Sequence, residues 1–159
     1  MRALAALTLA AAPAFAQTAD APLTPEENAR IFDEACLAST APEEAMETAA
    51  AALAPALFVP LDPGGFDLFQ ESSDGLATLG VAADETGSAC EMGLSVGAAD
   101  LGPALEEATR AAVLARAPDA EEQTLAAGTA WEWREGDLVF RTEYLQADDA
   151  FLLRHTISR

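Results

Sequence analysis

The chain has 159 residues, with 27 aspartates and glutamates against 8 basic residues, and its formal net charge is −19. All 8 basic residues are arginines. Nucleic acids and anionic membrane surfaces are bound through basic faces, so this composition argues against both as partners. A strongly acidic surface instead favours solubility, and it also suits a cationic partner or divalent cations. The expected partner is a basic protein or a small ligand.

The first residues are typical of a secretory signal peptide. Residues 1–16 begin with a single arginine, continue with an apolar stretch and end in Ala14-Phe15-Ala16, the small-x-small pattern before a cleavage site. We expect cleavage before Gln17 and a periplasmic or secreted product that is not inserted in the membrane. Residues 17–23 are short and polar and are predicted to be a disordered mature N-terminus, while residues 24–159 suit a single domain. The sequence does not indicate an oligomeric state.

Two cysteines, Cys36 and Cys90, remain in the expected mature chain. An oxidising compartment favours their pairing, and their spacing differs from both the C-x-x-C of redox-active pairs and the close spacing of zinc ligands. We therefore predict one structural disulfide between Cys36 and Cys90, with no metal and no cofactor.

Three segments have helical features. Thr24 and Glu27 can form a capping box for a helix that carries Cys36 on its buried face. Residues 40–43 repeat this start and predict a second helix that ends before Pro55. A third helix is expected to begin at Asp100 and to bury a stripe made of Leu101, Ala104, Leu105, Ala108, Ala112 and Ala115.

Alternating hydrophobic residues predict the strands. Residues 76–81 and 90–96 form a hairpin around a turn at 84–87, and three further strands follow over 129–134, 138–145 and 151–157. The expected order is ααββαβββ, an α+β fold with an antiparallel sheet of about five strands and helices packed on one face. The stretch from 55 to 75 is interpreted as a long connection, and 121–127 as a short helical turn.

Residues 93–97 read GLSVG and match the G-x-S-x-G pattern of a nucleophile elbow. Ser95 would be the nucleophile, His155 the base, and Asp137 or Asp148 the orienting acid. An elbow places its serine on a sharp turn that leads directly into a helix, whereas Ser95 lies in a strand-like alternation. The match is therefore a weak indication of catalysis, and an enzyme is not the favoured interpretation.

The remaining candidates are also weak. His155 shares a strand face with apolar residues and is expected within the packed face of the sheet or at its rim, rather than as a general base or a metal ligand. Trp131 and Trp133 share one face of a strand, which is either core or a stacking platform for a ligand. Four carboxylates could gather a calcium ion, but they lack the spacing of a calcium loop: Asp62, Asp67, Glu71 and Asp74.

The leading hypothesis is a noncatalytic, exported binding or interaction module of the cell envelope, whose acidic surface steers a basic partner. A small serine hydrolase that uses Ser95 and His155 is the first alternative. A structural component of the envelope is the second.

Overall fold

The structure is a computed structural model that describes residues 24–53, 58–60, 65–72, 76–95, 101–148 and 150–159. The expected signal peptide, the N-terminal segment 17–23 and Asp62, Asp74 and Asp100 all lie outside these residues.

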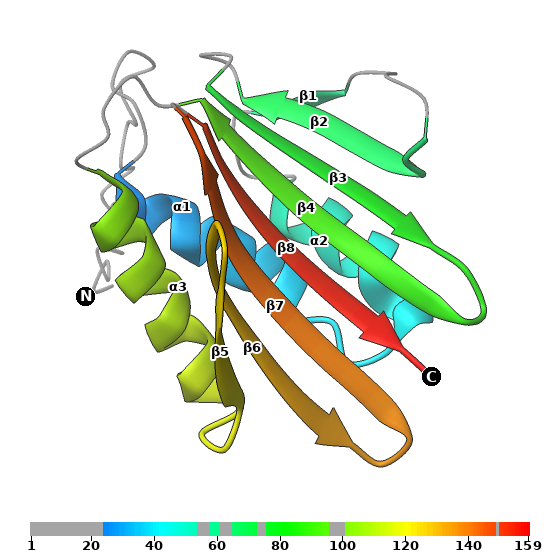
Figure 1. Ribbon diagram of the computed structural model, residues 1–159. Coiled ribbons are helices and arrows are strands. Elements are labelled where there is room, and N and C mark those ends of the chain that lie inside the picture. The colour runs from blue at the N-terminus through cyan, green and yellow to red at the C-terminus, as the bar shows by residue number, and fades with distance from the viewer. Residues whose placement is uncertain (1–23, 54–57, 61–64, 73–75, 96–100, 149) are drawn as a thin grey trace, which may run out of the picture.

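An antiparallel sheet of eight strands forms the body of the molecule (Figure 1). Its spatial order is β1-β2-β3-β4-β8-β7-β6-β5, so the C-terminal strand β8 lies in the middle and β1 and β5 form the edges. The strands are β1 (Phe58–Pro60), β2 (Leu68–Ser72), β3 (Ala77–Ala83), β4 (Gly87–Ser95), β5 (Glu121–Leu125), β6 (Gly128–Glu135), β7 (Leu138–Ala147) and β8 (Ala150–Ser158).

The sheet consists of two four-stranded meanders joined at the centre. Strands β1 to β4 form the first meander and β5 to β8 the second, and the antiparallel pair of β4 with β8 connects them over nine residue positions from Gly87↔Ser158 to Ser95↔Ala150. The helix α3 (Gly102–Arg116) links the two meanders. Because β8 pairs with both β4 and β7, it holds the two meanders together.

The helices cover one face of the sheet and leave the other face without a layer of described residues (Figure 1). Helix α1 (Pro25–Phe32) begins with the expected capping box, in which Thr24 and Glu27 bond each other's backbone N–H groups. It continues as a π-helical turn η1 (Asp33–Leu37), and a 3₁₀ turn η2 (Pro42–Glu44) precedes α2 (Ala45–Leu53). Among the described residues, no helix is long and apolar enough to span a bilayer.

The predicted disulfide is confirmed. Cys36 in η1 is bonded to Cys90 in β4, with 5.5 Å between their α-carbons, and both side chains are buried. The bond therefore fastens the helical layer to a central strand of the sheet. The α+β class and the antiparallel sheet are confirmed as well.

The expected sheet of about five strands and the order ααββαβββ are incomplete, because the sheet has eight strands and the order is ααββββαββββ. The segment from 55 to 75 contains two strands, β1 and β2, which extend the first hairpin into a meander. The predicted helical turn at 121–127 is wrong, because Glu121–Leu125 forms β5 and pairs with β6. Strands β1 and β5 are the edges of the sheet and β2 lies next to β1, and with three to five residues each they are too short to show a clear alternation.

Candidate functional site

Ser95 and His155 are not brought together. Ser95 is exposed at the end of β4 and pairs with Ala150, whereas His155 pairs with Cys90. His155 is thus five positions along β8 from Ala150, about 17 Å at roughly 3.4 Å per residue. Because the offset is odd, the two side chains also lie on opposite faces of the sheet. Ser95 and His155 therefore do not lie within hydrogen-bonding reach of each other.

The hydrogen bond of His155 goes to a hydroxyl group instead of a carboxylate. Its Nδ1 lies 2.9 Å from Oγ1 of Thr142 on the neighbouring strand β7. The two candidate orienting acids lie in turns, Asp137 between β6 and β7, and Asp148 between β7 and β8. Among the described residues, Nε2 of His155 has no hydrogen-bond partner.

His155 is 2% exposed and its ring stacks on Trp133 and Phe140, with centroid distances of 5.6 and 6.1 Å. Burial lowers the pKa of His155 from 6.5 to about 3, and the positive charge of Arg116 acts in the same direction. The imidazole is therefore neutral throughout the physiological range. A neutral, enclosed imidazole packed between aromatic rings acts as part of the core.

Trp131 and Trp133 also belong to the core. Trp131 is fully buried, and its indole N–H donates to Oε2 of Glu122 at 3.0 Å. Trp133 stacks on Phe140 with a centroid distance of 5.2 Å. Both side chains face the helical layer, so neither forms an exposed stacking platform for a ligand.

The acidic connection from 55 to 75 is described only in part. Asp67 accepts a hydrogen bond from the backbone N–H of Ala83 at 2.9 Å, and Glu71 lies in β2 opposite Thr78. Asp62 and Asp74 lie outside the described residues. Within the described ranges, no three His, Cys, Asp or Glu side chains are grouped so that they could hold a metal ion.

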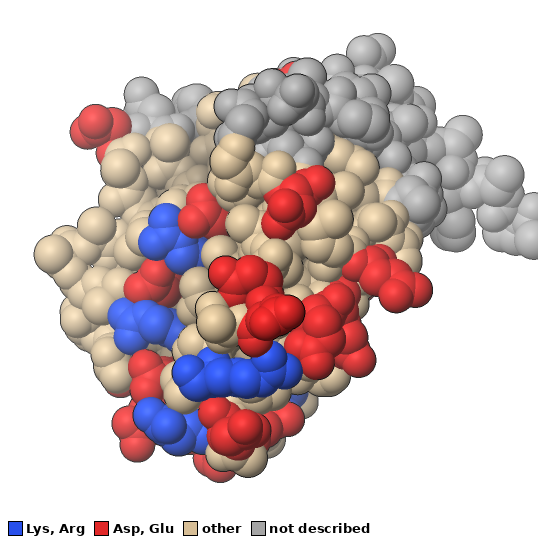
Figure 2. Space-filling model, turned by 90° about the vertical axis from the view of Figure 1, so that its right-hand side faces the viewer, with Lys and Arg blue, Asp and Glu red and all other residues tan. Residues whose placement is uncertain are grey.

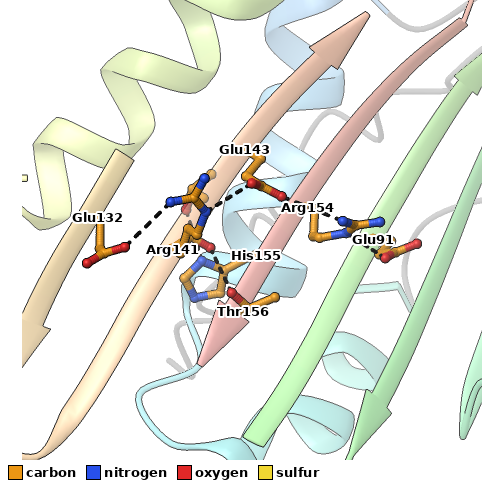
Figure 3. Close-up of polar contacts among 8 residues, drawn as sticks. Glu91, Glu132, Arg141, Glu143, Arg154, His155 and Thr156 are labelled. Atoms are coloured by element: carbon orange, nitrogen blue, oxygen red, sulfur yellow. Dashed lines mark hydrogen bonds and ion pairs between the residues drawn. The ribbon is translucent and has the colours of Figure 1, made fainter. Parts of the chain in front are cut away.

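The uncovered face of the sheet carries an ion-pair row that crosses four strands (Figure 3). Arg141 binds Glu132 on β6 and Glu143 on its own strand at 3.5 and 2.9 Å, and Arg154 on β8 binds Glu143 and Glu91 at 3.6 and 2.7 Å. We call these five residues, Glu132, Arg141, Glu143, Arg154 and Glu91, the ion-pair row. Charges alternate along the row, so this face of the sheet is polar, as a face that no described helix covers needs to be.

Glu143 is the centre of this row. It contacts both arginines and its side chain is 16% exposed, the lowest value in the row. We expect Glu143→Gln to lower the free energy of unfolding by about 1 kcal/mol, because two partly desolvated guanidinium groups lose a shared carboxylate. Urea unfolding measures this change. Glu47→Gln, at an exposed position of α2, serves as the matched control, and equal effects of the two substitutions would contradict the assigned role.

Nearly all cations of the described chain are neutralised within the molecule. Six of its seven arginines form ion pairs with carboxylates, and only Arg134 has no such partner among the described residues. Figure 2 shows arginines lying among acidic side chains on one side of the molecule. Because acidic residues outnumber basic ones 27 to 8, the surface retains a large excess of carboxylates without a cation.

Strand β5 is the one edge whose side chains are fully described. Its residues are exposed except for Leu125, which is half-buried, and it pairs only with β6. Glu122 accepts hydrogen bonds from Arg110 of α3 and from Trp131, and these bonds hold the pKa of Glu122 below its ordinary value. An ionised carboxylate thus anchors β5 to both the helix and the neighbouring strand.

Comparison with protein-family models, with curated proteins and with solved structures found no match.

The sequence reasoning missed the ion-pair row and the β5 edge. Arg141 and Glu143 are two residues apart on a strand that was predicted, so their shared face could have been read from the alternation. Which charges lie beside them on β6, β8 and β4 depends on strand order and register, which the sequence pattern did not provide. The edge was missed because residues 121–124 contain no apolar side chain.

Proposed function

We propose that this chain is an exported, noncatalytic binding module whose partner is a basic protein or peptide. The observation that carries the proposal is the internal pairing of its arginines. Since six of the seven described arginines already have carboxylate partners, the remaining carboxylates are available to a positively charged partner. Opposite charge on two surfaces speeds their encounter and fixes their relative orientation.

The structural disulfide supports an oxidising location, since such bonds persist in the periplasm and outside the cell. Burial of His155 and its separation from Ser95 leave the hydrolase alternative without a supporting contact. Saturable binding of a basic ligand would distinguish the proposed function from a purely structural role in the envelope, which requires no such binding.

The proposal is tested with a lysine-rich peptide of about fifteen residues and a glutamate-rich peptide of equal length. We expect saturable binding of the lysine-rich peptide alone, weakened at least about tenfold between roughly 50 and 500 mM salt, because salt screens exposed charges. Isothermal titration calorimetry gives affinity and stoichiometry.

An unrelated protein of equal net charge is the control for unspecific attraction. Equal affinity of that protein for the lysine-rich peptide would contradict the proposal. Absence of saturable binding at low salt would favour the structural role.

A further inference from the structure

The outer side of β5 has unused backbone hydrogen-bonding groups. β5 is the terminal strand of the sheet, and among the described residues its backbone bonds only to β6. An open strand edge can pair with an extended segment of another chain, which then adds a strand to the sheet. We call this outer side of Glu121–Leu125 the β5 edge.

The β5 edge also has an unbalanced charge. On the uncovered face, Glu121 lies directly opposite Glu132 of β6, and like charges at such cross-strand positions are unfavourable. Glu132 reaches Arg141 at 3.5 Å, whereas Glu121 has no cationic partner among the described residues. A cation placed on the outer side of β5 would offset this repulsion.

Carboxylates also lie on the helix-facing side of the β5 edge. Glu106 of α3 accepts a hydrogen bond from Thr129, whose partner on β5 is Thr124. Glu122 on β5 itself binds Arg110 of the same helix at 2.8 Å, and this contact raises the pKa of Arg110. On this side the carboxylates of Glu106 and Glu122 outnumber the single guanidinium group of Arg110, so an incoming strand would meet net negative charge on both of its faces.

These charges select among possible partners. Two β5 edges from two copies of this chain would bring glutamates together, so the charges oppose self-association through this edge. A strand with lysine or arginine side chains would gain the same backbone hydrogen bonds together with attraction instead of repulsion.

We propose that the β5 edge binds an extended, basic segment of the partner as an additional antiparallel or parallel strand, with a lysine or arginine beside Glu121. This inference rests on the proposed function and names the part of the acidic surface that performs it. The backbone of the partner provides affinity, and its alternating basic side chains provide specificity.

The probe is a peptide of about nine residues with alternating lysine and threonine, a length typical of strands. Its matched control has the same sequence with every backbone amide methylated, which preserves the charge and removes the N–H donors. We expect the unmethylated peptide to bind the full chain at least about tenfold more tightly, and the backbone amides of β5 to become protected from hydrogen exchange.

Two variants with the same change in net charge locate the site. We expect Glu121→Lys to weaken binding of the unmethylated peptide about tenfold, because attraction is replaced by repulsion. Glu47→Lys, on exposed α2, should alter it by less than about twofold. Unfolding midpoints close to that of the native chain would show that both variants are folded. Glu121→Gln provides a milder change at the same position.

The possible results separate the two proposals. Equal affinity of the methylated peptide, or equal weakening by Glu121→Lys and Glu47→Lys, would overturn strand addition at β5 while leaving a cation-binding acidic surface. Failure of both peptides to bind at low salt would overturn the proposed function and this inference together.

Discussion

Replacing both cysteines, as Cys36→Ala with Cys90→Ala, is expected to lower the free energy of unfolding by about 4 kcal/mol. The disulfide closes a loop with a sequence separation of 54, and the loss of loop entropy in the unfolded chain accounts for a value of this size. Both side chains are almost fully buried, so the small voids left by alanine act in the same direction. Urea unfolding measures the change.

Reduction of the native chain is the control for this prediction. In the presence of a thiol reductant strong enough to open the buried bond, the native chain and the double variant should unfold at nearly the same urea concentration. A double variant as stable as the oxidised native chain would show that the bond between η1 and β4 adds nothing to stability.

The disulfide also illustrates what the sequence could predict. The helical spacing of Phe32 and Cys36 predicts that Cys36 lies on the buried face of the first helix, and the alternation along residues 90–96 predicts that Cys90 faces the core. Both positions are buried in the structure, and the α-carbons lie within bridging distance. Local periodicity suffices where an element has one apolar face and one polar face, because burial then follows the repeat.

The third helix shows where periodicity misleads. An alanine-rich stripe was expected to be buried, yet Ala104 and Ala115 are exposed. The buried residues are Gly102, Leu105, Thr109 and Val113. Thr109 can be buried because its hydroxyl donates to the carbonyl oxygen of Leu105 at 2.8 Å. Alanine is compatible with either face, so in a helix rich in alanine it does not reveal the orientation.

Strand β5 shows a different limit. Glu121–Leu125 has almost no apolar content, and its extended conformation follows from pairing with β6 on one side alone. Edge strands commonly carry charged residues, which protect them from unwanted pairing, so their sequences lack the usual alternation. The candidate binding edge therefore lies in a segment that periodicity cannot predict.

The stability of the chain is expected to fall as the pH is lowered from about 6.5 towards 3, and His155 contributes to this fall. The folded chain holds the pKa of His155 at about 3, whereas an exposed histidine has a value near 6.5. Below pH 6.5 the unfolded chain binds a proton that the folded chain cannot accommodate. The contribution of His155 to stability is thus fully present above pH 6.5 and is lost at about 1.4 kcal/mol per pH unit until about pH 3.

The double substitution Thr142→Val with His155→Leu should remove this component. Carboxylates titrate in the same range in both proteins. The quantity to compare is therefore the unfolding free energy of the variant minus that of the native chain, measured once at pH 7.5 and once at pH 4.5. His155 is the only histidine in the chain, which makes the assignment of this difference direct. We expect this value, variant minus native chain, to be about 2 to 3 kcal/mol higher at pH 4.5 than at pH 7.5.

At pH 7.5 the double variant should be as stable as the native chain or more stable. It replaces two buried polar side chains by apolar groups of similar size. One of the two, His155, has a ring nitrogen, Nε2, without a hydrogen-bond partner among the described residues. His155→Leu alone leaves the buried hydroxyl of Thr142 without its partner and should cost about 1 to 3 kcal/mol relative to the double variant. If the pH dependence of the double variant matched that of the native chain, the imidazole would have to be accessible to protons in the folded state. His155 would then be a titrating group within the fold, in conflict with its burial among Trp133, Phe140 and Thr142.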